Sequence, residues 1–175
     1  MSRLEFAKKQ LEKYPEKSEI LTELPAWVKV GKNVFIDKNV HFVSRGFGYI
    51  EIDGKLTHIP HSGEVIIEND VEITSGANIV RATADKTIIG AGTKINFGVH
   101  VAHNVKIGKN CLIIANSVIG GSAEIGDNCY IGIGALIKNK VRIGNNVTVG
   151  MGAVVLKDIP DNETWVGNPA KKLEK

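Results

Sequence analysis

The sequence has few aromatic residues, few leucines and few cysteines, and each shortage excludes a class of protein. Phe, Trp and Tyr make up 6% of the 175 residues, and 9 Leu stand against 22 Ile and 18 Val. This preference for β-branched side chains excludes a helical bundle and favours strands. Two cysteines are too few for a disulfide framework, and no apolar run is long enough to span a membrane.

The charge is modest and spread along the chain. The formal net charge is +3, and the lysines are not interleaved with aromatic residues, so we expect no nucleic-acid groove. The N-terminal stretch lacks an apolar core followed by a small-residue cleavage site. We therefore expect a cytoplasmic protein of one domain that does not insert into membranes.

What the sequence does contain is a repeat of six residues. Residues 89–160 divide into twelve hexads without insertion, each beginning with Ile or Val and carrying a small or β-branched fifth residue. Twelve such beginnings in a row would arise by chance with a probability of roughly 10⁻⁸. Three hexads fit one triangular turn, so we predict an all-β fold, a parallel β-helix that buries the first and fifth positions.

The repeat divides the single domain into three parts. They are an N-terminal helix and lead-in over 1–27, the β-helix over 28–160, and a C-terminal loop and tail over 161–175. We expect the helix and the tail to cap the open ends of the coil, which would otherwise expose unpaired strand edges. The helix is predicted from the apolar spacing of Leu4, Ala7, Leu11 and Tyr14, with its end at Pro15.

The register of the repeat is broken twice, over 43–65 and around 82–88. The first break contains the turn dipeptide Asp53-Gly54 between two short alternating segments, which predicts a projecting hairpin. Projecting loops on rigid scaffolds often carry substrate contacts, although the hairpin could equally be an excursion that only covers the coil.

Positions three hexads apart stack on one corner of the predicted prism, and the three corners differ. The polar corner, which we interpret as scaffold, has Ala91, Lys109, Asp127 and Asn145. The apolar corner has Phe97, Ala115, Ile133 and Met151. An exposed apolar row implies a second copy of the chain, a bound acyl chain or pantetheine arm, or both. We favour a cyclic homotrimer, because a prism with one apolar edge closes naturally with threefold symmetry.

The third corner has residues suited to chemistry, namely His103, Gly121, Asn139 and Lys157. His103 occupies the third position of its hexad, where the side chain faces outward, so it is not a core histidine. Gly121 follows one turn later, where its backbone N–H is not shielded by a side chain. A base beside an exposed N–H is an arrangement that fits acyl transfer, although an ordinary surface histidine is the alternative.

The other histidines are assigned by their place in the repeat. His100 ends the preceding hexad and is expected beside the same cleft. His41, His58 and His61 precede the first break or lie in it, and we expect them at the surface or on the substrate side.

The orienting group for His103 is not evident from the repeat. Counting back one turn along the chain reaches Asp85, but this residue falls in the second register break, and a backbone carbonyl is the alternative. Cys111 and Cys129 are also one turn apart, at the inward fifth position. We interpret them as core residues rather than as a nucleophile or metal ligands.

Four segments resemble the UDP-3-O-acylglucosamine N-acyltransferase family of lipid A synthesis, and the likeness covers roughly 43–158. They are GFGY at 46–49, RATADKTIIG at 81–90, VHVAHNVKIGKN at 99–110 and IIANSVIGGSAEIG at 113–126. The resemblance implies a left-handed coil, a trimer, His103 as general base and the Gly121 N–H as oxyanion donor. The candidate substrate contacts are Arg81, Asp85, His100 and Asn104.

Three departures from that family bear on the donor. We expect neither the family's N-terminal nucleotide-binding domain nor its C-terminal helical extension, and Lys140 stands where the family has a second histidine. The segment KDIPDNETWVGNPAKK at 157–172 instead resembles hexapeptide acetyltransferases that use acetyl-CoA. This likeness makes four residues candidate contacts for the coenzyme: Asn139, Lys140, Lys157 and Lys171.

Taken together, these features predict an acetyl-CoA-dependent N-acetyltransferase, without a metal, that acts on a nucleotide-linked amino sugar in surface polysaccharide or lipopolysaccharide synthesis. One alternative is an acyl-carrier-protein-dependent N-acyltransferase of the UDP-acylglucosamine type. Another is a zinc carbonic anhydrase, for which the HxxH at 100–103 leaves the third ligand unidentified. The last is a passive structural module, which the dissimilar corners disfavour.

Overall fold

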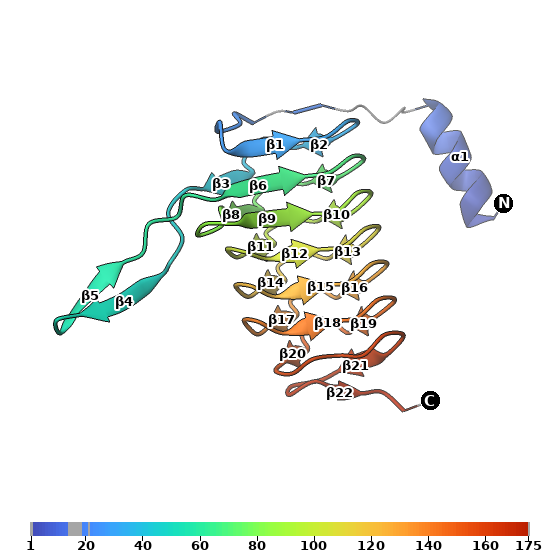
Figure 1. Ribbon diagram of the computed structural model, residues 1–175. Coiled ribbons are helices and arrows are strands. Elements are labelled where there is room, and N and C mark those ends of the chain that lie inside the picture. Colours follow the sequence, from blue (N-terminus) through green and yellow to red (C-terminus); the bar gives the residue numbers. More distant parts are fainter. Residues whose placement is uncertain (1, 14–18, 21, 175) are drawn as a thin grey trace.

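The structure is a computed structural model that describes residues 2–13, 19–20 and 22–174. Short strands on successive turns stack into three sheets of a β-solenoid (Figure 1). The predicted all-β parallel β-helix is confirmed, and the architecture is consistent with a left-handed coil.

Each sheet forms one face of the prism, with strands in the order in which they pair. Sheet A consists of β2 (Phe35–Ile36), β7 (Glu72–Ile73), β10 (Lys94–Ile95), β13 (Leu112–Ile113), β16 (Tyr130–Ile131), β19 (Thr148–Val149), β21 (Thr164–Val166) and β22 (Lys171–Lys172). Sheet B consists of β1 (Val28–Val30), β6 (Glu64–Ile67), β9 (Lys86–Ile89), β12 (Lys106–Ile107), β15 (Glu124–Ile125) and β18 (Arg142–Ile143). Sheet C consists of β3 (His41–Val43), β8 (Asn78–Val80), β11 (His100–Val101), β14 (Val118–Ile119), β17 (Leu136–Ile137) and β20 (Val154–Val155).

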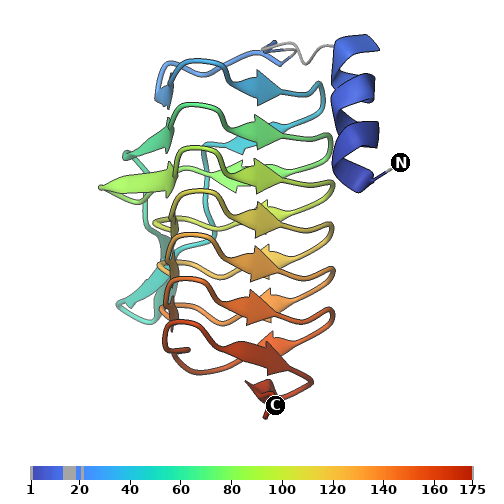
Figure 2. The same ribbon diagram turned by 90° about the vertical axis from the view of Figure 1, so that its right-hand side faces the viewer.

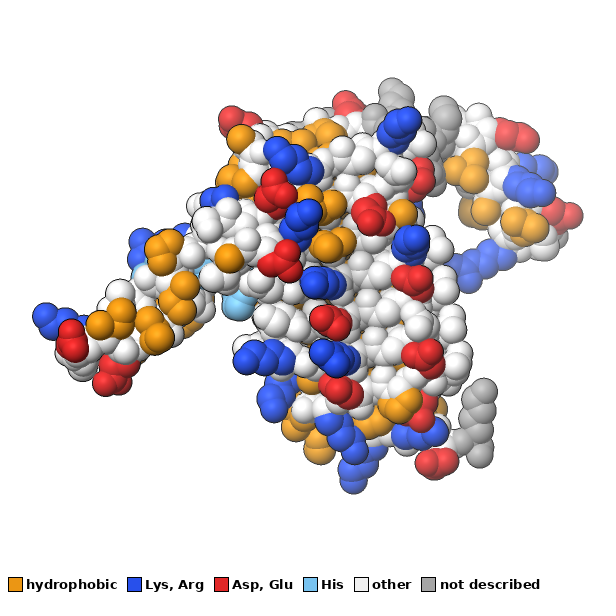
Figure 3. All heavy atoms as spheres, viewed as in Figure 1, with side chains coloured by type: hydrophobic (Ala, Val, Ile, Leu, Met, Phe, Trp, Pro, Cys, Tyr) orange, Lys and Arg blue, Asp and Glu red, His pale blue; other side chains and the backbone are white. Residues whose placement is uncertain are grey.

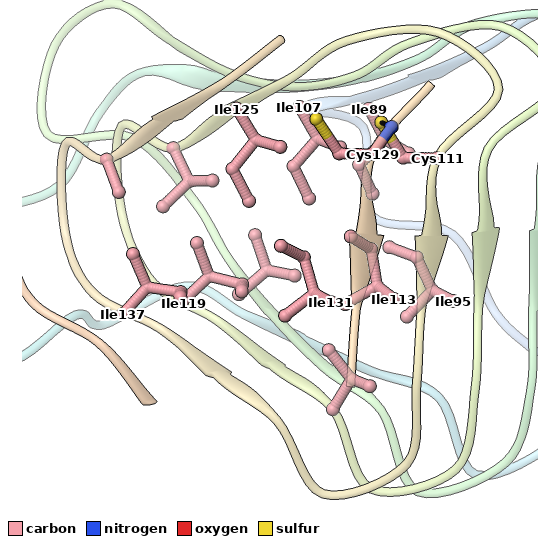
Figure 4. Packing of buried hydrophobic residues seen from close by; sticks show 14 of the residues in the cluster. Ile89, Ile95, Ile107, Cys111, Ile113, Ile119, Ile125, Cys129, Ile131 and Ile137 are labelled. Atoms are coloured by element: carbon pink, nitrogen blue, oxygen red, sulfur yellow. Dashed lines mark hydrogen bonds between the residues drawn. The ribbon is translucent and has the colours of Figure 1, made fainter. Parts of the chain in front are cut away.

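The register of the sheets confirms the turn of three hexads. His100 pairs in parallel with Val118, and Val118 in turn pairs with Leu136. The first and fifth positions of all twelve hexads are buried, and the stacked isoleucines fill the prism (Figure 4). Each fully buried Ile or Val stabilises the fold by about 1.5–3 kcal/mol relative to exposure, so the core is built from many small, equal contributions.

The two cysteines lie inside this core as free thiols, one turn apart. The Cys129 backbone N–H donates to the Cys111 sulfur at 3.4 Å, and the Cys129 thiol donates to the Gly144 carbonyl at 3.0 Å. The hydrogen bond with Cys111, followed by burial, raises the pKa of the Cys129 thiol well above its usual range. These contacts agree with the interpretation of the pair as core residues.

The ends of the coil are closed by different means. At the C-terminal end, β21 extends sheet A beyond the predicted limit at residue 160, and Trp165 is buried there. At the other end, the capping box of Ser2 and Glu5 begins helix α1 (Arg3–Lys13), but no residue of α1 is buried. The expected helical cap is therefore wrong: the lead-in, where Ile20 bridges to Ile36, contacts the first turn instead. Tyr14 and Pro15 lie outside the described residues.

The predicted hairpin is present and projects from the coil (Figures 1 and 2). Strands β4 (Tyr49–Ile52) and β5 (Lys55–His58) pair in antiparallel fashion around Asp53 and Gly54, both with positive φ. The second break forms a short loop between β8 and β9. Both insertions follow a strand of sheet C and precede one of sheet B, so they lie on the same corner as His103.

Candidate active site

His103 stands on the corner between β11 and β12, and its hydrogen bonds fix its tautomer. Its Nδ1 lies 3.0 Å from Oδ1 of Asn104, which also accepts from the backbone N–H and the hydroxyl of Thr83. Because an amide oxygen can only accept, Nδ1 carries the proton and Nε2 keeps its lone pair. Asn104 therefore takes the orienting role for which Asp85 was the candidate.

Asn104 is itself held by the second insertion and by the corner. Its φ of 62° is a left-handed conformation that Asn tolerates, and its backbone N–H donates to the Thr87 hydroxyl at 3.0 Å. The buried Thr87 hydroxyl in turn donates to the Val80 carbonyl at 2.9 Å. The tautomer of His103 is thus set by a network of neutral groups from two consecutive turns.

Gly121 lies against the His103 imidazole, on the next turn. A Cβ built on Gly121 would lie 2.8 Å from Nε2 of His103, so any side chain would collide with the imidazole. Within the described residues, the Gly121 N–H donates to no acceptor, whereas its carbonyl accepts from Lys140. The Gly121 backbone therefore lies against the Nε2 side of the His103 imidazole, as the stacking of the repeat predicts.

The first insertion places a second histidine, His61, against His103. His61 is 8% exposed, and its ring packs edge-to-face on His103 with a centroid distance of 5.4 Å. Its Nδ1 lies 3.0 Å from the Ile59 carbonyl, its buried Nε2 has no hydrogen-bond partner in the described part of the chain, and burial lowers its pKa. His61, expected at the surface or on the substrate side, is buried against His103, in a space where a Cβ on Gly46 would collide with its ring.

A cleft of about 370 Å³ opens beside His103 along the outer face of sheet C. Its lining comes from the base of the hairpin, from sheet C and from the corner: Val43, Arg45, Gly46, Phe47, Asn78, Val80, His100, Ala102, His103, Val118, Gly120, Gly121 and Asn139. His100 lines it as expected, and burial lowers the pKa of its imidazole.

Two predicted substrate contacts lie apart from this cleft. The Arg81 guanidinium donates to the carbonyls of Gly63 and Ser62 at 2.7 and 2.9 Å, which ties the end of the first insertion to the coil. Asp85 is exposed and lies 3.8 Å from the Lys106 ammonium. Neither lines the cleft, and Asn104 does not line it either, so substrate contact by these three residues stays a prediction.

Three of the four candidate coenzyme contacts, Asn139, Lys140 and Lys157, follow the corner of His103 toward the C-terminus, and Lys171 lies in sheet A. Asn139 lines the cleft, and Lys140 is exposed on the same turn with a φ of 64°. Lys157 lies over the ring of Trp165 at 5.2 Å, and Lys171 is exposed in β22. Along this corner Asn139 and Lys140 lie closer in the stack of turns to His103 than Lys157 does, while Lys171 belongs to the final strand.

Sequence reasoning missed Arg45, Phe47, His61 and the two threonines that hold Asn104. All of them lie in or beside the insertions, where the repeat does not set the position of a residue. One signal was nevertheless available: counting back three hexads from His103 reaches residue 85, inside the second break, so this break interrupts the repeat at the corner that has His103.

Among the described residues, no group of three or more His, Cys, Asp or Glu side chains is arranged to hold a metal ion. The described part of the chain also contains no helix with the length and apolar character that crossing a membrane requires.

The hexads of the coil match a known family model. Residues 86–121 and 122–157 match the bacterial transferase hexapeptide family (six repeats), and this part of the chain belongs to that family. UDP-3-O-acylglucosamine N-acyltransferase of Caulobacter vibrioides (strain NA1000 / CB15N) is 49% identical over 146 residues, which cover 83% of this chain and 43% of that protein. The chain thus spans less than half the length of the curated relatives it matches.

Solved structures share the fold at low identity. UDP-N-acetylglucosamine acyltransferase from Campylobacter jejuni superimposes with a TM-score of 0.70 at 22% identity, over 85% of this chain and 64% of that chain. A mutant of perosamine N-acetyltransferase from Caulobacter crescentus, in complex with CoA and GDP-perosamine, gives a TM-score of 0.50 at 22% identity, over 84% of this chain and 58% of that chain.

Proposed function

We propose that the protein is an N-acetyltransferase that transfers an acetyl group from acetyl-CoA to a nucleotide-linked amino sugar. The observation that carries this proposal is the position of Gly121, one turn further along, against the Nε2 side of His103, with an N–H that donates to no acceptor in the described residues. A general base beside a fixed N–H donor is what the attack of an amine on a thioester requires.

In this mechanism the sugar amine attacks the thioester carbonyl carbon, and His103 Nε2 accepts the proton that the nitrogen loses. The Gly121 N–H donates to the tetrahedral oxyanion, whose charge develops only in the transition state. The carbon–sulfur bond then breaks, and the imidazolium returns its proton to the departing CoA thiolate. Asn104 holds Nδ1–H throughout, so one nitrogen serves as acceptor and then as donor.

Two features support the assembly and the donor in this proposal. The exposed apolar edge supports a homotrimer, because Ile133 is 51% exposed and Met151 78% exposed where a monomer would have polar side chains. Acetyl-CoA is supported by the C-terminal segment that resembles hexapeptide acetyltransferases, whose candidate contacts Lys140 and Lys157 follow His103 along its corner.

The experiment that tests the proposal replaces His103. We expect His103→Ala to lower kcat by about 10²–10⁴, the usual contribution of a general base, with the thermal unfolding temperature unchanged. Thiol release from acetyl-CoA is followed with a panel of UDP- and dTDP-linked amino sugars. The control is Lys109→Ala on the polar corner, which should retain full turnover. Normal turnover by His103→Ala would remove the base assignment.

A second candidate is acyl transfer from acyl carrier protein. It is favoured by the 49% identity to a UDP-3-O-acylglucosamine N-acyltransferase. Direct competition between acetyl-CoA and acyl-carrier-protein thioesters separates the two: turnover only with the carrier protein would establish this donor instead.

A further inference from the structure

The charge of the cleft points to an anionic ligand. Its ionisable lining residues are Arg45, His100 and His103, and no Asp or Glu lines it. Arg45 gives this concave site a positive charge that no lining carboxylate offsets, so the site attracts negative charge, and its low-dielectric walls strengthen that attraction. The anionic groups available in the proposed reaction are the phosphates of the nucleotide sugar and of the coenzyme.

Arg45 is the side chain best suited to bind such a phosphate. It follows β3 at the point where the first insertion leaves the coil, and it is exposed at the rim of the cleft. Its guanidinium makes no hydrogen bond or ion pair with any residue in the part of the chain that the structure describes. A planar guanidinium with free donors binds phosphate oxygens in pairs, which a lysine does not do.

Phe47 lies two residues further along and is 90% exposed, an unfavourable position for a phenyl ring unless something covers it. The backbone on both sides of it is anchored. His58 Nε2 lies 3.1 Å from the Gly46 carbonyl, and the Ile59 N–H donates to the Gly48 carbonyl at 2.8 Å. Only Tyr49 contacts the ring among described aromatic residues, edge-to-face at 5.0 Å, so a planar base can stack on it.

We infer that Arg45 and Phe47 form the nucleotide subsite. Arg45 binds a phosphate of the acceptor, and Phe47 stacks on its nucleobase. The inference rests on the proposed function, because it takes the sugar amine to lie at His103. The geometry separates the two substrates: Arg45 and Phe47 lie on the hairpin side of His103, whereas Asn139 and Lys140 lie on its C-terminal side. The acceptor therefore enters along the hairpin and the donor from the opposite end.

The test measures binding by titration calorimetry of the full chain, without turnover. The probes are UDP, dTDP, GDP, inorganic pyrophosphate and CoA, each titrated into the wild type, Arg45→Gln, Phe47→Ala and the control Lys55→Gln. Lys55 is an exposed cation at the hairpin tip that does not line the cleft. We expect Arg45→Gln to weaken pyrophosphate and the bound nucleoside diphosphate by about tenfold or more, because a charge-assisted phosphate contact is lost.

Phe47→Ala separates the two contacts, since it should weaken the nucleoside diphosphate but leave pyrophosphate unchanged. Lys55→Gln should match the wild type, and CoA affinity should be unaffected by Arg45→Gln. Equal nucleotide affinities for Arg45→Gln and Lys55→Gln would overturn the inference, as would a loss confined to CoA. So would a wild-type protein that binds none of the three nucleotides.

The outcome is distinguishable from that of the proposed function. A wild-type protein that acetylates a nucleotide-linked amino sugar, with nucleotide affinities that Arg45→Gln and Phe47→Ala leave unchanged, keeps the proposed function and loses this inference. Arg45-dependent nucleotide binding without any acetyl transfer does the reverse.

Discussion

At the scale of single residues, the main finding is that an amide oxygen rather than an acid orients His103. The sequence predicted the pairing of His103 with Gly121, because positions one turn apart must stack in this coil. It did not predict the role of Asn104 as orienting group, because that role depends on Thr83, which lies in an insertion outside the repeat. A neutral acceptor fixes the tautomer of His103 without placing a charge beside the base.

Replacing Asn104 tests this role directly. We expect Asn104→Gly to lower kcat by about 10²-fold, because a misoriented base loses near-attack geometry. Glycine tolerates the φ of 62° at this position, so the backbone turn should persist. Asn104→Asp keeps the acceptor and adds a negative charge that favours the imidazolium, so the rising limb of the pH–rate profile should move to higher pH. Wild-type kcat for Asn104→Gly, measured alongside thermal unfolding, would contradict this role.

At the scale of elements, the end of the hairpin nearest the coil is anchored to the corner that has His103. Two strands alone are marginally stable in water, and the described contacts that anchor this pair involve Gly46, Gly48 and His61. The turn dipeptide predicted the hairpin, but nothing in the repeat predicted that His61 would reach His103. The six-residue periodicity does not set the positions of residues in an insertion. Their packing depends on steric fit, and here Gly46 and Gly48 leave room for the His61 ring.

This packing predicts a pH dependence of stability. Burial lowers the pKa of His61 in the folded chain below the unfolded value of 6.5, so its contribution is present above pH 6.5 and is lost as the pH falls through the folded pKa. We expect the unfolding temperature to fall more steeply from pH 7.5 to 5.5 in the wild type than in His61→Gln, by about a few degrees. Differential scanning calorimetry measures both.

The comparison isolates His61. His100, whose pKa burial also lowers, contributes with the same sign in both proteins and cancels. The Gln amide can still donate to the Ile59 carbonyl, so the anchoring hydrogen bond is retained. If the unfolding temperatures of the two proteins fell in parallel with pH, His61 would have the same pKa in the folded and unfolded chains.

At the scale of the whole molecule, the three faces of the prism are chemically different. A column of alternating basic and acidic side chains runs down sheet B, where Arg142 lies 3.5 Å from Glu124 (Figure 3). The faces that meet at the apolar edge instead expose apolar side chains: Leu112 and Tyr130 on sheet A, and Val118 and Leu136 on sheet C. The sixth position of each hexad encodes this difference, so the sequence could have predicted two apolar faces as well as the edge.

Two apolar faces that meet at an apolar edge fit a closed ring of copies, in which sheet A of one protomer packs on sheet C of the next. We expect the wild type to have three times the chain mass in light scattering after gel filtration, and Ile133→Glu to be a monomer. The buried glutamate would lack a partner at the interface, and an unpaired buried charge costs several kcal/mol. Lys109→Glu on the polar corner is the matched control and should remain a trimer.

The same variant links assembly to catalysis. Val118 lies both on the apolar face of sheet C and in the cleft lining. A neighbouring copy packed on that face would therefore form one side of the cleft. Ile133→Glu should therefore lose most of its turnover even though His103, Asn104 and Gly121 lie within one chain. A monomeric variant with wild-type kcat and KM would show that one chain suffices for the reaction, whereas a monomeric wild type would leave the apolar edge without the copy that we assign to it.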